Sequence, residues 1–282
     1  MAVAEIRGVP HIYDLTPPGR LPLTLVFIHG WMLSRHYWQP LQALLAPDYQ
    51  CLSYDLRGFG DSRPAAASSS YSLETYADDL VQLLETLRIQ DCWLIGHSLG
   101  GSVALWTADR LPRQVQGVIG VNAGGGIYLK EEFRRFRRAG VQMVRLRPAW
   151  LRQMPGLDRV MARANVVRPL ARSWGQQRVE DFVKACPKAA IRTLLAATTE
   201  EEVYRLPQVV ARLPQPVYFL AGDQDTIMPT PYVRHLASFH SLFNQGQNTV
   251  VELPNCGHLA MLEHPKLVAE QIRRVVSQHC PV

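Results

Sequence analysis

The chain has 282 residues, of which 47% are hydrophobic, and its 30 Lys and Arg against 24 Asp and Glu give a formal net charge of +6. No apolar stretch approaches the roughly 18 residues that span a bilayer, and residues 1–7 lack the apolar core of a signal peptide, so we predict a cytoplasmic protein. The five cysteines form an odd set without metal-ligand spacing, which predicts neither a disulfide framework nor a metal site.

Short apolar runs alternate with helical patterns along the chain. Alternation of this kind predicts an α/β fold, in which a mostly parallel sheet carries helices on both faces. We predict strands near residues 23–28, 50–54, 92–95, 117–121, 216–221 and 248–253, and helices near 37–46, 72–88, 99–110, 230–240 and 265–279.

Residues 96–100, Gly-His-Ser-Leu-Gly, lie between a predicted strand and a predicted helix. A G-x-S-x-G sequence in this setting is typical of a nucleophile elbow, a sharp turn that lifts a serine hydroxyl above the end of the sheet. Gly96 and Gly100 suit such a turn because a Cβ at either position would collide with neighbouring backbone. Ser98 is therefore the candidate nucleophile.

A serine hydroxyl is a weak nucleophile near neutral pH and needs a histidine base, which a carboxylate orients. In this kind of site the acid and then the histidine follow the serine along the chain. Asp223 and Asp225 follow the predicted strand 216–221, and His258 follows the predicted strand 248–253. His258 is the candidate general base, and one of the two aspartates is its expected partner.

Two further segments complete a family resemblance. His29-Gly30-Trp31 follows a predicted strand, and residues 55–62 read Asp-Leu-Arg-Gly-Phe-Gly-Asp-Ser. With these segments and the elbow, the chain resembles the α/β-hydrolase superfamily from about residue 21 to its C-terminus, except in the middle. The resemblance implies a Ser98, Asp225 and His258 triad, because the family's G-x-x-D pattern falls on Asp225, with Asp223 as the alternative.

The resemblance also implies an oxyanion hole formed by the backbone N–H groups of Trp31 and Leu99. Some relatives carry the acid one strand earlier, but this chain has Asn122 there, which cannot act as a carboxylate. The serine argues against the haloalkane-dehalogenase and epoxide-hydrolase branches, which need an aspartate nucleophile. The expected reaction is cofactor-free hydrolysis of a carboxylic ester through an acyl-enzyme. Esterases and lipases are the expected relatives, and a weaker similarity points to the branch with the chlorophyll dephytylases.

The middle of the chain, residues 127–205, is a predicted helical lid between the two core segments, 1–126 and 206–282. The lid has 17 Lys and Arg against 8 Asp and Glu, a balance of +9, whereas the rest of the chain has a balance of −3. A helical pattern places its apolar residues within an arc of about 100° and its arginines on the other side. The apolar residues are Leu129, Phe133, Phe136, Gly140, Met143 and Val144, and the arginines are Arg134, Arg135, Arg138 and Arg145.

Two interpretations of this basic amphipathic helix stay open. The favoured one places the apolar stripe on the core or along the substrate pocket, with the arginines in solvent. The other rests the helix on an anionic membrane, so that the substrate is a lipid, prenyl or pigment ester from the bilayer. Nucleic acid is not an expected partner, because no stacking aromatic residues are interleaved with the arginines. Six other lid residues could either contact a large apolar substrate group or pack in the core. They are Trp150, Leu151, Met154, Leu157, Met161 and Trp174.

Two alternatives to an ester hydrolase remain. The same triad is compatible with a carbon–carbon bond hydrolase or a cofactor-free lyase, for which the lid arginines would bind a carboxylated substrate. From another class, a non-catalytic small-molecule receptor is an alternative, because this fold can lose its triad. All three predicted triad residues are present, which favours an enzyme.

Overall fold

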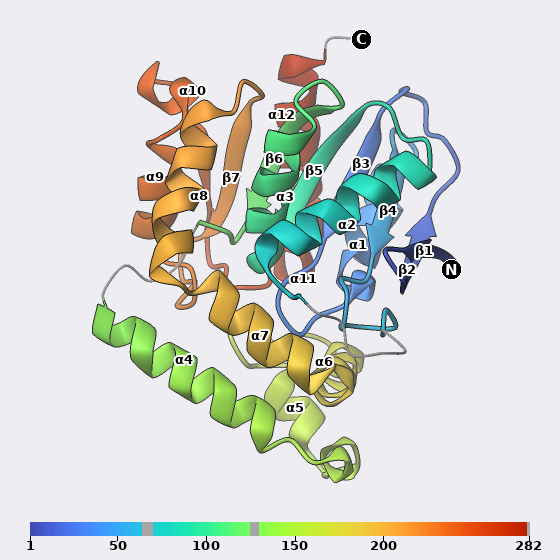
Figure 1. Ribbon diagram of the computed structural model, residues 1–282, viewed down its shortest axis with the longest axis vertical. Coiled ribbons are helices and arrows are strands. Elements are labelled where there is room, and N and C mark those ends of the chain that lie inside the picture. Colours follow the sequence, from blue (N-terminus) through green and yellow to red (C-terminus); the bar gives the residue numbers. More distant parts are fainter. Residues whose placement is uncertain (64–69, 125–129, 281–282) are drawn as a thin grey trace.

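The computed structural model describes residues 1–63, 70–124 and 130–280, with the side chains of 130–133 left out. Within these residues, eight strands form one sheet in the order β1-β2-β4-β3-β5-β6-β7-β8 (Figure 1). β2 is antiparallel to both of its neighbours, and the strands from β4 to β8 are parallel, which confirms the predicted fold class. The strands are β1 Ala2–Ile6, β2 Val9–Leu15, β3 Thr24–Ile28, β4 Gln50–Tyr54, β5 Cys92–His97, β6 Val115–Val121, β7 Val217–Gly222 and β8 Val250–Leu253.

The N-terminal hairpin of β1 and β2 was not among the predicted strands. Its two strands are joined by Arg7 and Gly8, which have φ angles of 51° and 72°. Two-residue turns with positive φ at both positions are the ones that connect hairpin strands without splaying them. The glycine in this short polar turn was the available sequence signal.

Helices cover both faces of the sheet (Figure 1). Every residue of β3, β5 and β7 is buried, as expected for parallel strands that are covered on both sides. No helix in the described parts of the chain is long and apolar enough to cross a membrane. One face carries α1 Gln39–Leu45, α11 Ala260–Glu263 and α12 Pro265–His279, and the other carries α2 Leu73–Thr86, α3 Leu99–Arg110, α8 Glu200–Arg212 and α9 Thr230–Ala237.

A helical insertion separates β6 from β7 and lies beyond one edge of the sheet (Figure 1). The predicted limit of the lid at residue 205 falls inside the continuous helix α8, so the division of the chain at that point stays a prediction. α8 also packs on the core, since Trp106 Nε1 donates a hydrogen bond of 2.6 Å to Glu202. Before α8, the insertion contains α4 Lys130–Arg145, the 3₁₀-helix Ala149–Gln153, α5 Leu157–Met161, α6 Arg172–Lys184 and α7 Pro187–Ala197.

Hydrogen bonds and an ion pair join α6 and α7 to the core. The hydroxyl of Ser34 donates to the Asp181 carboxylate at 2.8 Å, and the indole N–H of Trp31 donates to the carbonyl of Ala190 at 2.9 Å. These hydrogen bonds give buried polar groups of the core and the lid their partners, which stabilises this part of the lid against the core. Further contacts join Tyr76 to Thr193, Lys184 to Asp61, and the Cys186 N–H to the Gly58 carbonyl.

Asp181 is the buried acid of this contact. Burial raises the pKa of Asp181 to about 7, although hydrogen bonds from Gln177 and Ser34 act in the opposite direction. Its pKa in the folded chain is therefore above that of an exposed aspartate. The stability that Asp181 contributes is present at low pH and is lost as the pH rises through about 7.

We expect Asp181→Asn to raise the melting temperature at pH 8 and to raise it less at pH 5. The amide keeps the shape, its oxygen can accept from one of Ser34 and Gln177 while its NH2 donates to the other, and it carries no charge to bury. Thermal unfolding at both pH values measures this, with about 2–4 °C expected for each kcal/mol. Equal shifts at pH 5 and pH 8 would contradict the prediction.

Candidate active site

Ser98 forms a strained turn between β5 and α3. Its φ of 52° and ψ of −120° lie outside the regions that non-glycine residues usually adopt. Although it is the N-cap residue of α3, its side chain makes no capping hydrogen bond, so the hydroxyl is not used by the helix. A Cβ on Gly96 would collide with the Gly100 carbonyl, and one on Gly100 with the Ile28 carbonyl. The predicted sharp turn is therefore present.

His258 is paired with Asp225. The distance from His258 Nδ1 to Asp225 Oδ2 is 2.8 Å, and the Asp225 side chain has no exposed surface. Asp223 has a different contact, because its Oδ1 accepts a hydrogen bond of 3.0 Å from the Cys256 N–H. The two aspartates that the sequence left as alternatives thus have separate roles, and only Asp225 contacts the histidine.

The surroundings of Asp225 favour its ionised form. Burial by itself raises the pKa of Asp225, but the hydrogen bond from His258 and those from the N–H groups of Ile227 and Met228 outweigh it and hold the pKa below its ordinary value. An ionised carboxylate only accepts hydrogen bonds, so His258 Nδ1 carries the proton. Nε2 is then left as the acceptor that a general base requires.

Asn122 completes this cluster, a role that was not predicted from the sequence. Its Nδ2 donates to Asp225 Oδ2 at 2.9 Å and to the Gly257 carbonyl at 3.0 Å. Its Oδ1 accepts from the Ala260 N–H at 3.3 Å. Asn122 therefore links the end of β6 to the acid and to the histidine loop. Its position directly after β6 was the signal that could have found it.

His97 lies beside His258 and supports its loop. His97 Nε2 donates to the His258 carbonyl at 2.7 Å, and the ring centroids are 4.8 Å apart. Burial lowers the pKa of His97 to about 3, so the ring is neutral at physiological pH. A neutral ring places no charge next to the imidazole of His258.

The lid contributes to the support of the histidine loop. The His258 N–H donates to the carbonyl of Asn165 at 2.8 Å. The carboxylate of Glu263 accepts from the Gly257 N–H at 3.0 Å and from the Val167 N–H at 2.7 Å. The loop and residues 165–167 of the lid are therefore parts of one hydrogen-bonded unit.

One cavity of about 550 Å³ contains four of the five predicted site residues. Ser98, His258, Trp31 and Leu99 line it, and Asp225 lies behind the histidine. Most of the other lining side chains are apolar. Those from the lid and α8 include Phe136, Met143, Leu194, Val203 and Leu206. Ser102, Thr198 and Glu202 give the wall a polar part.

The two predicted oxyanion donors lie on segments that meet at the elbow. Leu99 is the first residue of α3, and N–H groups in the first turn of a helix have no carbonyl partner inside that helix. Trp31 follows Gly30, where a Cβ would stand 3.2 Å from Ser98 Cβ and 2.8 Å from His97 Nδ1. Gly30 therefore allows the loop after β3 to approach the nucleophile.

The apolar stripe of α4 faces inward. Phe136, Gly140 and Met143 line the cavity and Val144 is buried, whereas Leu129 and the Phe133 side chain lie outside the described residues. Arg134, Arg135, Arg138 and Arg145 are exposed. None of the six lid residues that could contact an apolar substrate, Trp150 and Trp174 among them, lines this cavity.

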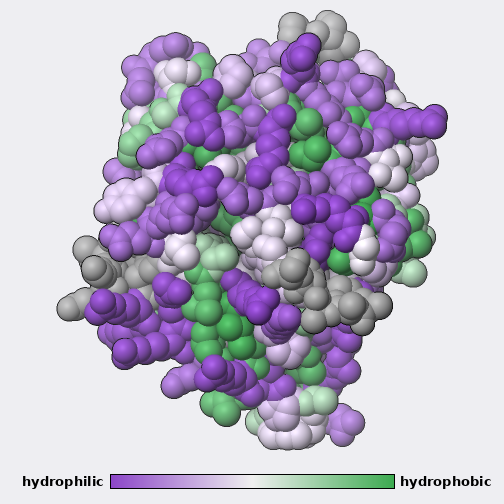
Figure 2. Space-filling model, viewed as in Figure 1, coloured by the Kyte–Doolittle hydropathy of each residue, from purple (hydrophilic) through white to green (hydrophobic). Residues whose placement is uncertain are grey.

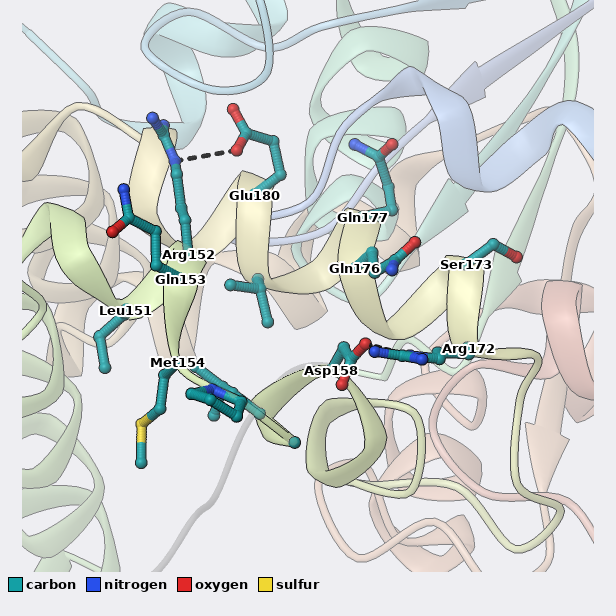
Figure 3. Close-up of a pocket in the computed structure, with 14 residues that line it drawn as sticks. Leu151, Arg152, Gln153, Met154, Asp158, Arg172, Ser173, Gln176, Gln177 and Glu180 are labelled. Atoms are coloured by element: carbon teal, nitrogen blue, oxygen red, sulfur yellow. Dashed lines mark hydrogen bonds and ion pairs between the residues drawn. The ribbon is translucent and has the colours of Figure 1, made fainter.

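A second cavity, of about 600 Å³, lies within the lid between the 3₁₀-helix Ala149–Gln153, α5 and α6 (Figure 3). It contains none of the predicted site residues. Its charged side chains are paired, Arg152 with Glu180 at 2.8 Å and Arg172 with Asp158. Across the described part of the chain, no group of three His, Cys, Asp or Glu is placed to hold a metal ion.

Comparisons with solved structures show the same fold. An esterase from Thermogutta terrifontis has a TM-score of 0.78 at 22% identity, over 99% of this chain and 100% of the esterase. An enol-lactonase from Burkholderia xenovorans LB400 has a TM-score of 0.77 at 20% identity, over 98% of this chain and 100% of the lactonase.

Relatives in sequence carry the names of several activities. Over 274 residues the chain is 30% identical to 2-succinyl-6-hydroxy-2,4-cyclohexadiene-1-carboxylate synthase of Yersinia pseudotuberculosis serotype O:1b (strain IP 31758), covering 90% of this chain and 87% of the synthase. RutD of Stutzerimonas stutzeri (strain A1501), which bears the name of a carbamate hydrolase, is 40% identical over 100 residues, and the match spans only 37% of its length.

The family model described as alpha/beta hydrolase fold matches residues 24–265 of the chain. This range contains the elbow, the two aspartates and the histidine loop. The chain therefore belongs to the α/β-hydrolase fold family.

Proposed function

We propose that this protein is a serine hydrolase that cleaves a carboxylic ester of a hydrophobic substrate by means of Ser98, His258 and Asp225. The observation that carries the proposal is the pairing of His258 with a buried, ionised Asp225 at a cavity that also contains Ser98. A strained serine, an oriented imidazole and free backbone donors in one cavity are the parts that acyl transfer needs.

In the proposed mechanism, Ser98 Oγ attacks the ester carbonyl while its proton moves to His258 Nε2. The N–H groups of Trp31 and Leu99 bind the negative oxygen of the tetrahedral intermediate. His258 then returns the proton to the leaving alcohol, and an acyl-enzyme remains on Ser98. A water molecule, deprotonated by His258, releases the acid and restores the serine.

The cavity supports a substrate with a large apolar group. Apolar side chains form most of its wall, many of them from α4, α7 and α8, and such walls favour burial of a hydrocarbon chain. Among the described residues that line it, Arg178 is the one cation, and its guanidinium already donates to the carbonyls of Met161 and Ala164. A lipid, prenyl or pigment ester fits this chemistry.

A second candidate is a carbon–carbon bond hydrolase or cofactor-free lyase on the same triad. The observation that favours it is the similarity to the synthase, whose name is that of a carboxylate product. A carboxylated substrate needs a free cation in the cavity, which Arg178 does not supply in its present contacts. The ester hydrolase therefore has the stronger support.

The nucleophile is tested with a fluorophosphonate probe. We expect the native protein to be labelled at Ser98 and Ser98→Ala to lose both the labelling and ester hydrolysis, by at least about a thousandfold. Peptide mass analysis locates the label, and Ser277→Ala, at an exposed site that does not line the cavity, is the matched control. A folded native protein that resists the probe would favour the receptor alternative.

The acid is tested by replacing each aspartate separately with asparagine. Asp225→Asn should lower kcat by about four orders of magnitude, because the amide favours the wrong tautomer of His258. Asp223→Asn should lower it far less, since Asp223 contacts only the Cys256 N–H. Steady-state hydrolysis of a p-nitrophenyl ester measures both, and equal losses would contradict the assignment.

The apolar cavity is tested by filling it. Val203→Trp should reduce kcat/KM for a dodecanoate ester about tenfold or more and leave a butyrate ester nearly unchanged, because only the long chain reaches that wall. Val3→Trp, at a site on β1 that is 60% exposed and does not line the cavity, controls for the added indole. An equal effect on both esters would show that Val203 does not contact the acyl chain.

A further inference from the structure

Four large apolar side chains are exposed at the end of the lid. Leu146, Trp150, Met154 and Val160 have exposed fractions of 77%, 61%, 48% and 62%, and we call them the lid tip. They come from one continuous stretch that runs from the end of α4 through the 3₁₀-helix to α5. Single exposed apolar residues are common, but a group on one segment indicates a contact surface.

The segment that carries the lid tip is strongly basic, and Glu180, which follows it, pairs with only one of its arginines, Arg152. Residues 133–179 contain twelve arginines, no lysine, and a single acidic residue, Asp158. Asp158 is paired with Arg172, so it does not offset the other arginines. Figure 2 shows apolar surface in the lower part of the molecule, where Figure 1 places the lid, with hydrophilic residues beside it.

Four of these arginines lie on the outer side of α4. Arg134, Arg135, Arg138 and Arg145 are exposed, and none has a carboxylate partner among the residues that the structure describes. The helix turns its other side, with Phe136 and Gly140, toward the cavity. Exposed guanidinium groups can bind anions outside the molecule, and guanidinium matches phosphate with two parallel hydrogen bonds.

We propose that the lid tip and the outer arginines of α4 dock the protein on an anionic lipid bilayer. The side chains of the lid tip enter the boundary between headgroups and acyl chains, where tryptophan is favoured, and the arginines bind lipid phosphates. The surface that inserts differs from the apolar stripe of α4. The described residues of that stripe line the cavity or are buried. Charge complementarity selects a bilayer over a second copy of this basic lid.

Met143 joins this surface to the cavity. It lines the cavity that contains Ser98 and is also 42% exposed, only three residues before Leu146. Leu146 lies one helical turn after Met143, so one side chain of the lid tip is close to the wall of the cavity. The docking itself does not depend on the proposed reaction and is tested without it.

The experiment measures sedimentation of the full chain with vesicles of phosphatidylglycerol and phosphatidylcholine, or of phosphatidylcholine alone. We expect binding to the anionic vesicles, weak binding to the neutral ones, and loss of binding at 0.5 M salt because surface charge is screened. The variant Leu146→Ser with Trp150→Ser should weaken partition about tenfold or more. The triple variant Arg134→Gln, Arg138→Gln and Arg145→Gln should weaken it by about fivefold for each charge removed.

Matched controls separate the lid tip from the rest of the surface. Val3→Ser removes an apolar side chain on β1 that is 60% exposed. Arg113→Gln removes an exposed arginine that lies outside the lid. Both should bind like the native protein, and thermal unfolding checks that every variant is folded. Brominated lipids give an independent readout, since they should quench Trp150 fluorescence and this quenching should disappear in Trp150→Phe.

Three results would overturn the proposal. The first is a native protein that stays in the supernatant with anionic vesicles. The second is binding that the tip and arginine variants leave unchanged or that the controls reduce equally. The third is a dimer in sedimentation-velocity experiments that the tip variants dissociate, which would assign the surface to a second copy of the chain.

Discussion

The buried carboxylate of Asp225 is the point on which the rest of the site depends. It follows β7 and receives hydrogen bonds from His258, from Asn122 at the end of β6, and from two backbone N–H groups of its own loop. A buried charge without partners would be costly, so these donors allow the carboxylate to stay ionised inside the fold. The imidazole of His258 then has a defined tautomer and a defined direction.

Parallel pairing explains how such distant residues meet. The register aligns Ile28 of β3 with Gly96 of β5, and Val121 of β6 with Leu220 of β7, so the strands end at the same edge of the sheet. Each functional segment follows one of these ends: the loop with Trp31, the elbow, Asn122 and Asp225. The sheet thus fixes the position of the site, and the strained φ of Ser98 is held by close packing around the elbow.

The lid is part of the candidate active site as well as its cover. Asn165 and Val167 bind to the same unit as the histidine loop, and Trp31, the residue of one proposed oxyanion donor, is bonded through its indole to the lid carbonyl of Ala190. Two sets of lid arginines have contrasting surroundings. Arg147 and Arg178 are buried and donate to backbone carbonyls, which stabilises the lid internally, whereas those on the outside of α4 give the surface its positive charge.

The sequence by itself determined the strand and helix alternation, the elbow at Ser98 and the order of acid and histidine, because these depend on local backbone geometry and on short spacings along the chain. Tertiary structure decided what depends on contacts between distant segments. It paired His258 with Asp225 rather than Asp223 and placed Asn122 on the same carboxylate. It also turned one side of α4 toward the cavity and left Leu146 and Trp150 in solvent. Helical periodicity shows that a helix has an apolar side, but only the packing of the whole chain determines what that side meets.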